Sequence, residues 1–253
     1  MKVVYHNDFN QVYTSDPAAA AGRIEAIYNA LKEKVTLVEA IPAGREDIEA
    51  VHTRSHIENI TRRGLYDIAA LAAGGAVQAA KIGLAEPSFA LVRPPGHHAS
   101  ADSSWGFCYF NNMAIAIAAL KREKMINRAF ILDIDLHCGD GTVNILGDCG
   151  YVAICNPGSG NRKDYLAEVT RKLPDKGIDI FGISAGFDYH EKDWGRLLTT
   201  DDYRIIGKLV RTASRKNNAG CFALLEGGYN HDVLGGNVFA LIEGMEQALY
   251  SIS

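Results

Sequence analysis

The chain has 253 residues, of which 47% are hydrophobic and 22% are charged. This length and composition suffice for one large core and are short for two ordinary α/β domains, so we predict a single domain over residues 1–253. The formal net charge of −4 provides no basic surface for nucleic acid or for an anionic membrane, and direct binding to either is not expected.

Apolar, β-branched runs alternate with segments of helical period along the chain. In chain order, the predicted elements are a strand at 2–5, a helix at 22–32, a strand at 35–41, a helix at 66–83, a strand at 88–93, a helix at 112–124, strands at 129–136 and 151–155, a helix at 164–173, a strand at 178–184, a helix at 201–216, a strand at 221–225 and a helix at 236–249. Apolar strands separated by helices indicate an α/β fold with a predominantly parallel sheet flanked by helices on both faces.

The cysteines and the N-terminal residues bear on the compartment. Five cysteines, an odd number without CxxC spacing, are typical of a reducing compartment rather than of a disulfide framework. The first residues, MKVVYHNDF, lack the apolar core of a signal peptide, and no apolar run approaches membrane-spanning length. We therefore predict a cytoplasmic protein without a membrane partner.

Four of the predicted strands run directly into polar clusters. SFALVR leads into PPGHHAS, AFILDIDLH into CGDGT, IDIFGIS into AGFDYH, and CFALL into EGGYN. Ligands of open α/β sheets bind beyond the carboxyl ends of the strands, so these clusters are expected to meet at one crevice.

The segment ILDIDLH predicts a metal site. Side chains alternate along a strand, so Asp133, Asp135 and His137 are expected on one face. Buried carboxylates need compensation, which a divalent cation provides. This pattern alone also allows another interpretation, in which the three residues end the strand with hydrogen bonds that face solvent. A further carboxylate, Asp188 in SAGFD, favours the metal, because carboxylates with one histidine are typical of catalytic zinc or another borderline metal.

The ordered motifs RPPGHHA, GFCYFNN, DIDLHCGDGT, SAGFD and LEGGYN resemble those of the zinc-dependent histone deacetylase and acetylpolyamine amidohydrolase family. The likeness runs from about residue 66 to the C-terminus, with a weaker echo in GRIEAI and AVHTRSHIENI. It implies the arginase/deacetylase fold and removal of an acyl group, such as acetyl, from an acyl-lysine, an acetylpolyamine or a small amide. It also implies that Asp135, His137 and Asp188 bind Zn²⁺, or else Fe²⁺ or another divalent ion.

The resemblance also assigns catalytic roles. His98 would be the general base and later the acid, with Asp140 as its partner, and His97 would be an electrostatic partner that contacts Asp133. Tyr229 would donate its hydroxyl to the oxyanion. Amide hydrolysis requires such a proton carrier and such a donor. Without the other motifs, adjacent histidines would be interpreted as polar surface and the tyrosine as a packed turn residue.

The substrate channel is expected to depart from the family pattern. Gly106 and Phe107 correspond to one wall of the family's narrow channel. The segment 151–173 lacks the longer glycine-rich loop that brings a second aromatic wall, and residues 56–66 lack the loop whose acidic residue holds a peptide backbone. We therefore expect a channel open on one side, weak recognition of peptides and a high Michaelis constant. The alternative is that a neighbouring subunit, or residues 102–105 or 191–196, form the second wall.

Two further departures concern the segment around the metal ligands. Cys138 stands where most relatives have a second histidine, which leaves the expected zinc ligands intact. Relatives bind a monovalent cation around the aspartate that corresponds to Asp133, and they draw on a hydroxyl from the next strand. The segment YVAIC offers no such hydroxyl, so that second ion is not firmly expected.

Other classes of protein remain open at this point. A two-metal, ureohydrolase-like enzyme would need more aspartates and would leave Tyr229 and the histidine pair without a purpose. A non-catalytic scaffold that binds acyl-amines would retain the fold without turnover. The expected partner is a small molecule or an acylated lysine, and a homo-oligomer is compatible with the sequence.

Overall fold

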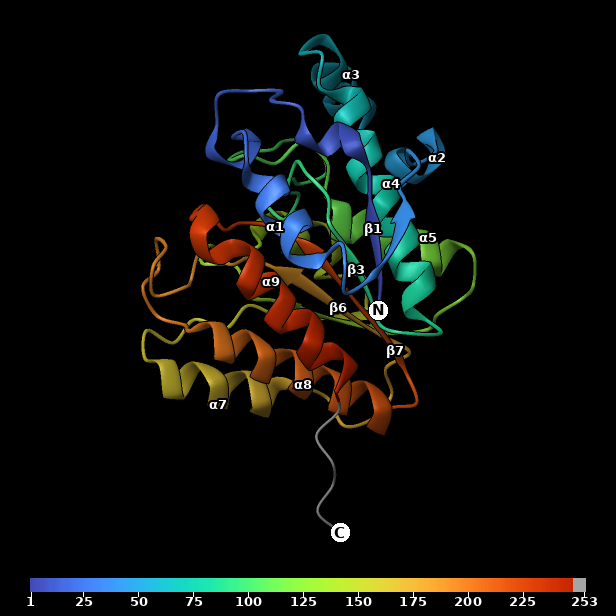
Figure 1. The fold of residues 1–253 in the computed structure, drawn as a ribbon. Helices are drawn as coiled ribbons and strands as arrows, with labels where there is room; N and C mark the ends of the chain where they lie inside the picture. Colours follow the sequence, from blue (N-terminus) through green and yellow to red (C-terminus); the bar gives the residue numbers. More distant parts are fainter. Residues whose placement is uncertain (248–253) are drawn as a thin grey trace.

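A computed structural model describes residues 1–247 of the chain. Within these residues, seven strands form one sheet in which every neighbouring pair is parallel, in the order β2-β1-β3-β7-β6-β4-β5 (Figure 1). The parallel sheet predicted from the sequence is thus confirmed. The strands are β1 (Lys2–Tyr5), β2 (Thr36–Glu39), β3 (Ser88–Ala90), β4 (Ala129–Asp133), β5 (Val152–Cys155), β6 (Ile180–Ala185) and β7 (Gly220–Leu225).

Helices connect the strands and cover the sheet. In the described residues they are η1 (Asn7–Asn10), η2 (Pro17–Ala19), α1 (Arg23–Leu31), α2 (Arg45–Glu49), α3 (Arg54–Arg62), α4 (Tyr66–Gly83), α5 (Asn112–Arg122), α6 (Asp140–Leu146), α7 (Arg162–Lys172), α8 (Thr200–Lys216) and α9 (His231–Glu246). Figure 1 shows α8 and α9 side by side, and α9 also packs against α1.

Both faces of the sheet carry helices, as predicted. Successive residues of a strand point to opposite faces, and β7 shows the two layers. The Cβ of Phe222 lies against Gly83 of α4, whereas the thiol of Cys221 faces Ser214 of α8. Buried apolar side chains from both layers form a continuous core around the sheet.

Three predicted elements differ from the observed ones by three or more residues at one end. α9 begins at His231 rather than at 236, because the Asn230 side chain accepts the N–H of Asp232 and caps the helix. β3 ends at Ala90 and β4 at Asp133, both earlier than predicted. The end of the predicted helix at 249 lies outside the described residues. The helices α2, α3 and α6 were not predicted.

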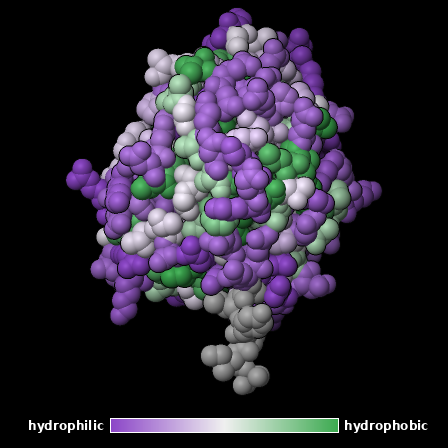
Figure 2. All heavy atoms as spheres, in the orientation of Figure 1, coloured by the Kyte–Doolittle hydropathy of each residue, from purple (hydrophilic) through white to green (hydrophobic). Residues whose placement is uncertain are grey.

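On the face seen in Figure 2, hydrophobic side chains lie in small separate patches among hydrophilic ones. In the part of the chain that the structure describes, no helix is both long and apolar enough to cross a membrane.

Candidate active site

The polar clusters that follow four strands meet at one edge of the sheet. β3, β7, β6 and β4 are consecutive neighbours in the sheet. Asp133 at the end of β4 aligns with Ser184 of β6, and Ala185 at the end of β6 aligns with Leu225 of β7. The chain therefore leaves these strands at the same edge, and the expected crevice is found there.

Asp135, His137 and Asp188 form a compact group of potential metal ligands. One ligand atom from each lies within 4.8 Å of the other two. Nδ1 of His137 is 3.2 Å from Oδ1 of Asp135 and 3.3 Å from Oδ2 of Asp188. The two carboxylates are buried, whereas the side chain of His137 is 41% exposed and lines a pocket. A ligand at this group would be reached from that pocket.

The prediction that these residues share a strand face is wrong. β4 ends at Asp133, so Asp135 and His137 lie in the loop that follows the strand. Oδ1 of Asp133 accepts the N–H of Asp135 at 3.1 Å, and Oδ1 of Asp135 accepts the N–H of His137 at 2.9 Å. Hydrogen bonds from side chain to backbone, rather than the alternation of a strand, therefore bring these groups together.

The group fits a divalent cation because one of its oxygens has no protein donor. Oδ1 of Asp188 accepts the N–H of Leu136 at 3.0 Å, but Oδ2 is buried and has no hydrogen-bond partner among the described residues. Such an oxygen is costly to bury unless a cation compensates its charge. Oδ2 of Asp135 accepts the N–H of Gly227 at 2.8 Å, where a Cβ would lie 2.5 Å from the same oxygen. Carboxylate and imidazole ligands suit zinc and similar metals.

The ionisation of the group reflects its crowding. Burial, reinforced by the charge of Asp135, raises the pKa of Asp188 to about 7. The carboxylates of Asp135 and Asp188, both close to its Nδ1, raise the pKa of His137 to about 10. Burial also raises the pKa of Asp135, but the charge on His97 and the hydrogen bonds from His137 outweigh it and hold that pKa below its ordinary value. Two buried carboxylates thus share one imidazole, and a cation would relieve their repulsion.

Each histidine of the pair has its own carboxylate. Nδ1 of His97 is 3.0 Å from Oδ2 of Asp133, and Nδ1 of His98 is 2.7 Å from Oδ1 of Asp140. Burial lowers the pKa of His97, but the carboxylates of Asp135 and Asp133 outweigh it and raise that pKa well above its ordinary value. Burial and the charge of His97 lower the pKa of His98 to about 4. The surroundings thus favour the cationic form of His97 and the neutral form of His98, which separates an electrostatic role from that of a base.

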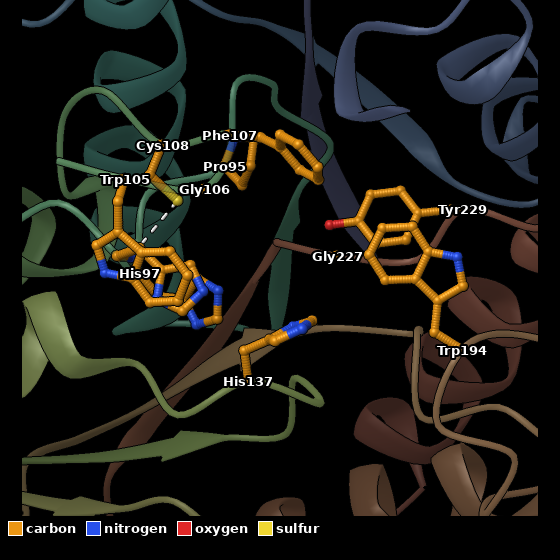
Figure 3. Close-up of a pocket in the computed structure, with 11 residues that line it drawn as sticks. Pro95, His97, Trp105, Gly106, Phe107, Cys108, His137, Trp194, Gly227 and Tyr229 are labelled. Carbon is orange, nitrogen blue, oxygen red and sulfur yellow. Dashed lines mark hydrogen bonds between the residues drawn. The ribbon is translucent and has the colours of Figure 1, made fainter. Parts of the chain in front are cut away.

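Tyr229 is held with its hydroxyl pointing into the pocket (Figure 3). Oδ2 of Asp193 accepts the N–H of Tyr229 at 2.7 Å and that of Asn230 at 2.8 Å. The buried guanidinium of Arg23 donates to the carbonyl of Gly228 at 2.8 Å and lies 5.5 Å from the tyrosine ring. Burial raises the pKa of Tyr229, so the phenol remains a neutral O–H donor.

A pocket with an empty volume of about 440 Å³ connects these groups. Gly106 and Phe107 line it, at the place predicted for one channel wall. In Figure 3, Trp105 and Trp194 flank the pocket on opposite sides, and Phe107 lies between them. Trp194 also lines the pocket and stacks on the Tyr229 ring at a centroid distance of 4.1 Å, so this side carries an aromatic wall, and the expectation of a channel open on one side stays a prediction.

Sequence reasoning missed several residues that support the site. Asp193 lies in a loop without a regular period, and its neighbour Trp194 was considered only as part of the alternative wall at 191–196. Arg23 belongs to GRIEAI, where the family likeness is weak. Oε2 of the buried Glu226 accepts the N–H groups of Gly96 at 2.7 Å and His97 at 3.3 Å. The only sequence signal for this contact was a glutamate directly after a strand. A solvent-exposed glutamate at that position would give the same signal.

The fold is that of a known class. The crystal structure of the HDA15 HD domain superposes with a TM-score of 0.79, and the match covers 99% of this chain and 91% of that one. The identity is 22%, so this likeness defines the fold alone. Together with the parallel sheet, it places the protein in the arginase/deacetylase-like class of α/β folds, as expected.

Sequence comparisons define the family. A family model described as the histone deacetylase domain matches residues 58–156. A probable deacetylase of Methanothermobacter thermautotrophicus is 32% identical, over 91% of this chain and 86% of its own length. A probable deacetylase of Archaeoglobus fulgidus is 31% identical, over 86% and 74%. The histone deacetylase-like amidohydrolase of Pseudomonas aeruginosa is 28% identical, over 85% and 74%. This chain belongs to the histone deacetylase family.

The same comparison agrees with the short loops noted in the sequence. The alignment with the Methanothermobacter protein extends over 289 positions, which is more than the 253 residues of this chain. That relative therefore has segments that this chain lacks.

Proposed function

We propose that the protein is a metal-dependent amidohydrolase that removes an acyl group, such as acetyl, from an amine. The observation that carries this proposal is the convergence of the Asp135, His137 and Asp188 group, two histidine–aspartate pairs and the Tyr229 hydroxyl on one pocket. Family membership supports the same reaction type.

The residues divide the work of amide hydrolysis. Asp135, His137 and Asp188 would hold Zn²⁺, or Fe²⁺ or another divalent ion, which as a Lewis acid would polarise the carbonyl and activate a water. The neutral imidazole of His98 would accept the proton of that water and later give a proton to the leaving amine. The cationic imidazole of His97 would stabilise negative charge beside it.

The oxyanion would be stabilised by a hydroxyl held in advance. Asp193, Arg23 and the stacked Trp194 fix the backbone and ring of Tyr229 before any substrate binds. A donor that needs no rearrangement stabilises developing charge at little cost. We assign this role to Tyr229 because its O–H is neutral and points into the pocket (Figure 3).

The walls suggest the substrate class. Aromatic side chains line the pocket on three sides, at Trp105, Phe107 and Trp194. Such walls suit an extended alkyl chain that ends in an acyl-amine, as in an acyl-lysine, an acetylpolyamine or a small amide. A reducing compartment such as the cytoplasm is part of the proposal, since the five cysteines are free.

Metal analysis and turnover together test the proposal. The purified protein should contain about one divalent ion per chain and should hydrolyse at least one member of a panel of acetylated lysines, polyamines and small amides. Bound metal without turnover of any member would favour a non-catalytic scaffold. Two ions per chain with hydrolysis of a guanidine would favour the ureohydrolase-like alternative.

Trp194→Ala should raise the Michaelis constant for acetylated alkylamines about 10-fold. The reason is that roughly 50 Å² of apolar substrate surface would lose its cover, at about 25 cal/mol per Å². Steady-state kinetics measure the effect, and Trp194→Phe, which retains an aromatic ring, should recover most of the affinity. An unaltered Michaelis constant in Trp194→Ala would mean that substrate does not contact this wall.

A further inference from the structure

We propose that Trp105 is a positioning residue for His98, the proton carrier of the proposed reaction. The proposal rests on the proposed function. It assigns to the tryptophan a task beyond lining the pocket, namely to hold the His98–Asp140 pair in one geometry.

Trp105 contacts both members of that pair. Its indole Nε1 donates to Oδ2 of Asp140 at 2.8 Å, while Oδ1 of the same carboxylate is 2.7 Å from Nδ1 of His98. Its ring stacks on the imidazole of His98, with centroids 3.7 Å apart and planes 30° apart. The indole, the carboxylate and the imidazole thus form a closed triangle in which each group contacts the other two.

The two histidine–aspartate pairs differ in how much support they need. In the pair of His97 and Asp133, the exposed fractions of the side chains are 4% and 2%, so burial and the hydrogen bond that Asp133 accepts from the N–H of Asp135 immobilise both groups. In the pair of His98 and Asp140, the exposed fractions are 6% and 43%. A carboxylate exposed to this degree can rotate and exchange its hydrogen bonds with water. The indole N–H fixes its second oxygen and so fixes the first.

The turn after Trp105 brings the indole to this position. Gly106 has a φ of +60°, a conformation that favours glycine, and a Cβ there would lie 3.0 Å from Cδ2 of His98. The chain therefore passes close to the imidazole of His98, and the side chain of Trp105 lies over the face of that ring. Trp105 remains 53% exposed, so burial of its own ring does not explain its place.

Trp105→Phe tests the hydrogen bond while it retains an aromatic ring. Loss of a side chain that orients a group in direct contact with the reaction typically costs about 10–100-fold in activity. We expect kcat for an acetylated alkylamine to fall about 10-fold, with little change in the Michaelis constant and in metal content. An aryl acetate, whose phenolate leaves without a proton, should show a smaller loss, because only the alkylamine needs the proton that His98 delivers.

The hydrogen bond can also be observed without turnover. The chain has two tryptophans, so ¹⁵N labelling of the indoles should give two N–H signals, and the one missing in Trp105→Phe belongs to Trp105. In Asp140→Ala, this signal should move upfield and exchange faster with water. The signal of Trp194, on the opposite side of the pocket, serves as the internal control.

The outcomes separate this inference from the proposed function. Failure of the wild-type protein to hydrolyse any acyl-amine would refute the proposed function. Two results with an active wild-type protein would overturn the role of Trp105: an unchanged kcat in Trp105→Phe, or an indole signal that does not respond to Asp140→Ala.

Discussion

Replacing Asp188 with asparagine should lower metal binding and amide hydrolysis together, each by more than about 100-fold. Removing a residue that only orients a metal ligand typically lowers metal affinity or activity about 10–100-fold. The loss of a direct ligand should exceed that range. Asparagine has nearly the shape of aspartate, so the buried site should keep its packing while one charged oxygen is lost. Elemental analysis of the purified variant and steady-state kinetics measure the two effects.

Asp175→Asn provides a matched control for this variant. Asp175 undergoes the same chemical change in an exposed ion pair with Lys216 at 3.2 Å, where the contribution to stability is small. It should retain metal and activity. Full metal occupancy in Asp188→Asn would remove this residue from the ligand group, whatever the activity of the variant.

Tyr229→Phe should retain the metal, and its kcat should fall about 10²–10³-fold, the usual effect of removing one oxyanion donor. The Michaelis constant should change little, because the hydroxyl contributes mainly to the transition state and the ring remains stacked on Trp194. The measurement is a full kinetic comparison on one acetylated amine, together with metal analysis.

Tyr165→Phe controls for the loss of a buried phenol. The hydroxyl of Tyr165 is buried without a hydrogen-bond partner in the described part of the chain, and the residue does not line the pocket. Its removal should leave kcat unchanged. A rate in Tyr229→Phe within about twofold of wild type would show that another group stabilises the oxyanion.

Regular elements could be predicted where side-chain pattern alone determines them. α4 runs from Tyr66 to Gly83 as predicted, because alanines and larger aliphatic residues recur with helical period over several turns. The start of α9 was missed because Gly235 and Gly236 weaken the helical signal. The first of these glycines is required by packing, since a Cβ there would lie 2.5 Å from the carbonyl oxygen of Ala26 in α1.

The site was predictable to the extent that it follows strand ends. The clusters that contain His97, Asp133, Asp188 and Tyr229 meet at the sheet edge because parallel strands end together. The end of β4 could not be predicted, because Ile134 and Leu136 continue the apolar pattern beyond the point where Asp133 binds the backbone of the next residues.

Apart from Gly106 and Phe107, the residues that form the walls of the pocket could not be assigned from the sequence, for a related reason. They come from loops whose course depends on single hydrogen bonds, such as those from the backbone of Tyr229 and Asn230 to Asp193. Neither period nor composition carries such information. The two exposed tryptophans were visible in the sequence, but only the structure places Trp105 and Trp194 at the same cavity.

That placement gives the protein a built-in optical probe. Tryptophan dominates the near-ultraviolet emission of a protein, and both tryptophans of this chain line the same pocket. A ligand that displaces water there should alter the surroundings of both fluorophores, so binding curves can be recorded on the unlabelled chain. For the same reason, emission reports poorly on the rest of the molecule, and changes at the far edge of the sheet around β2 would leave the spectrum almost untouched.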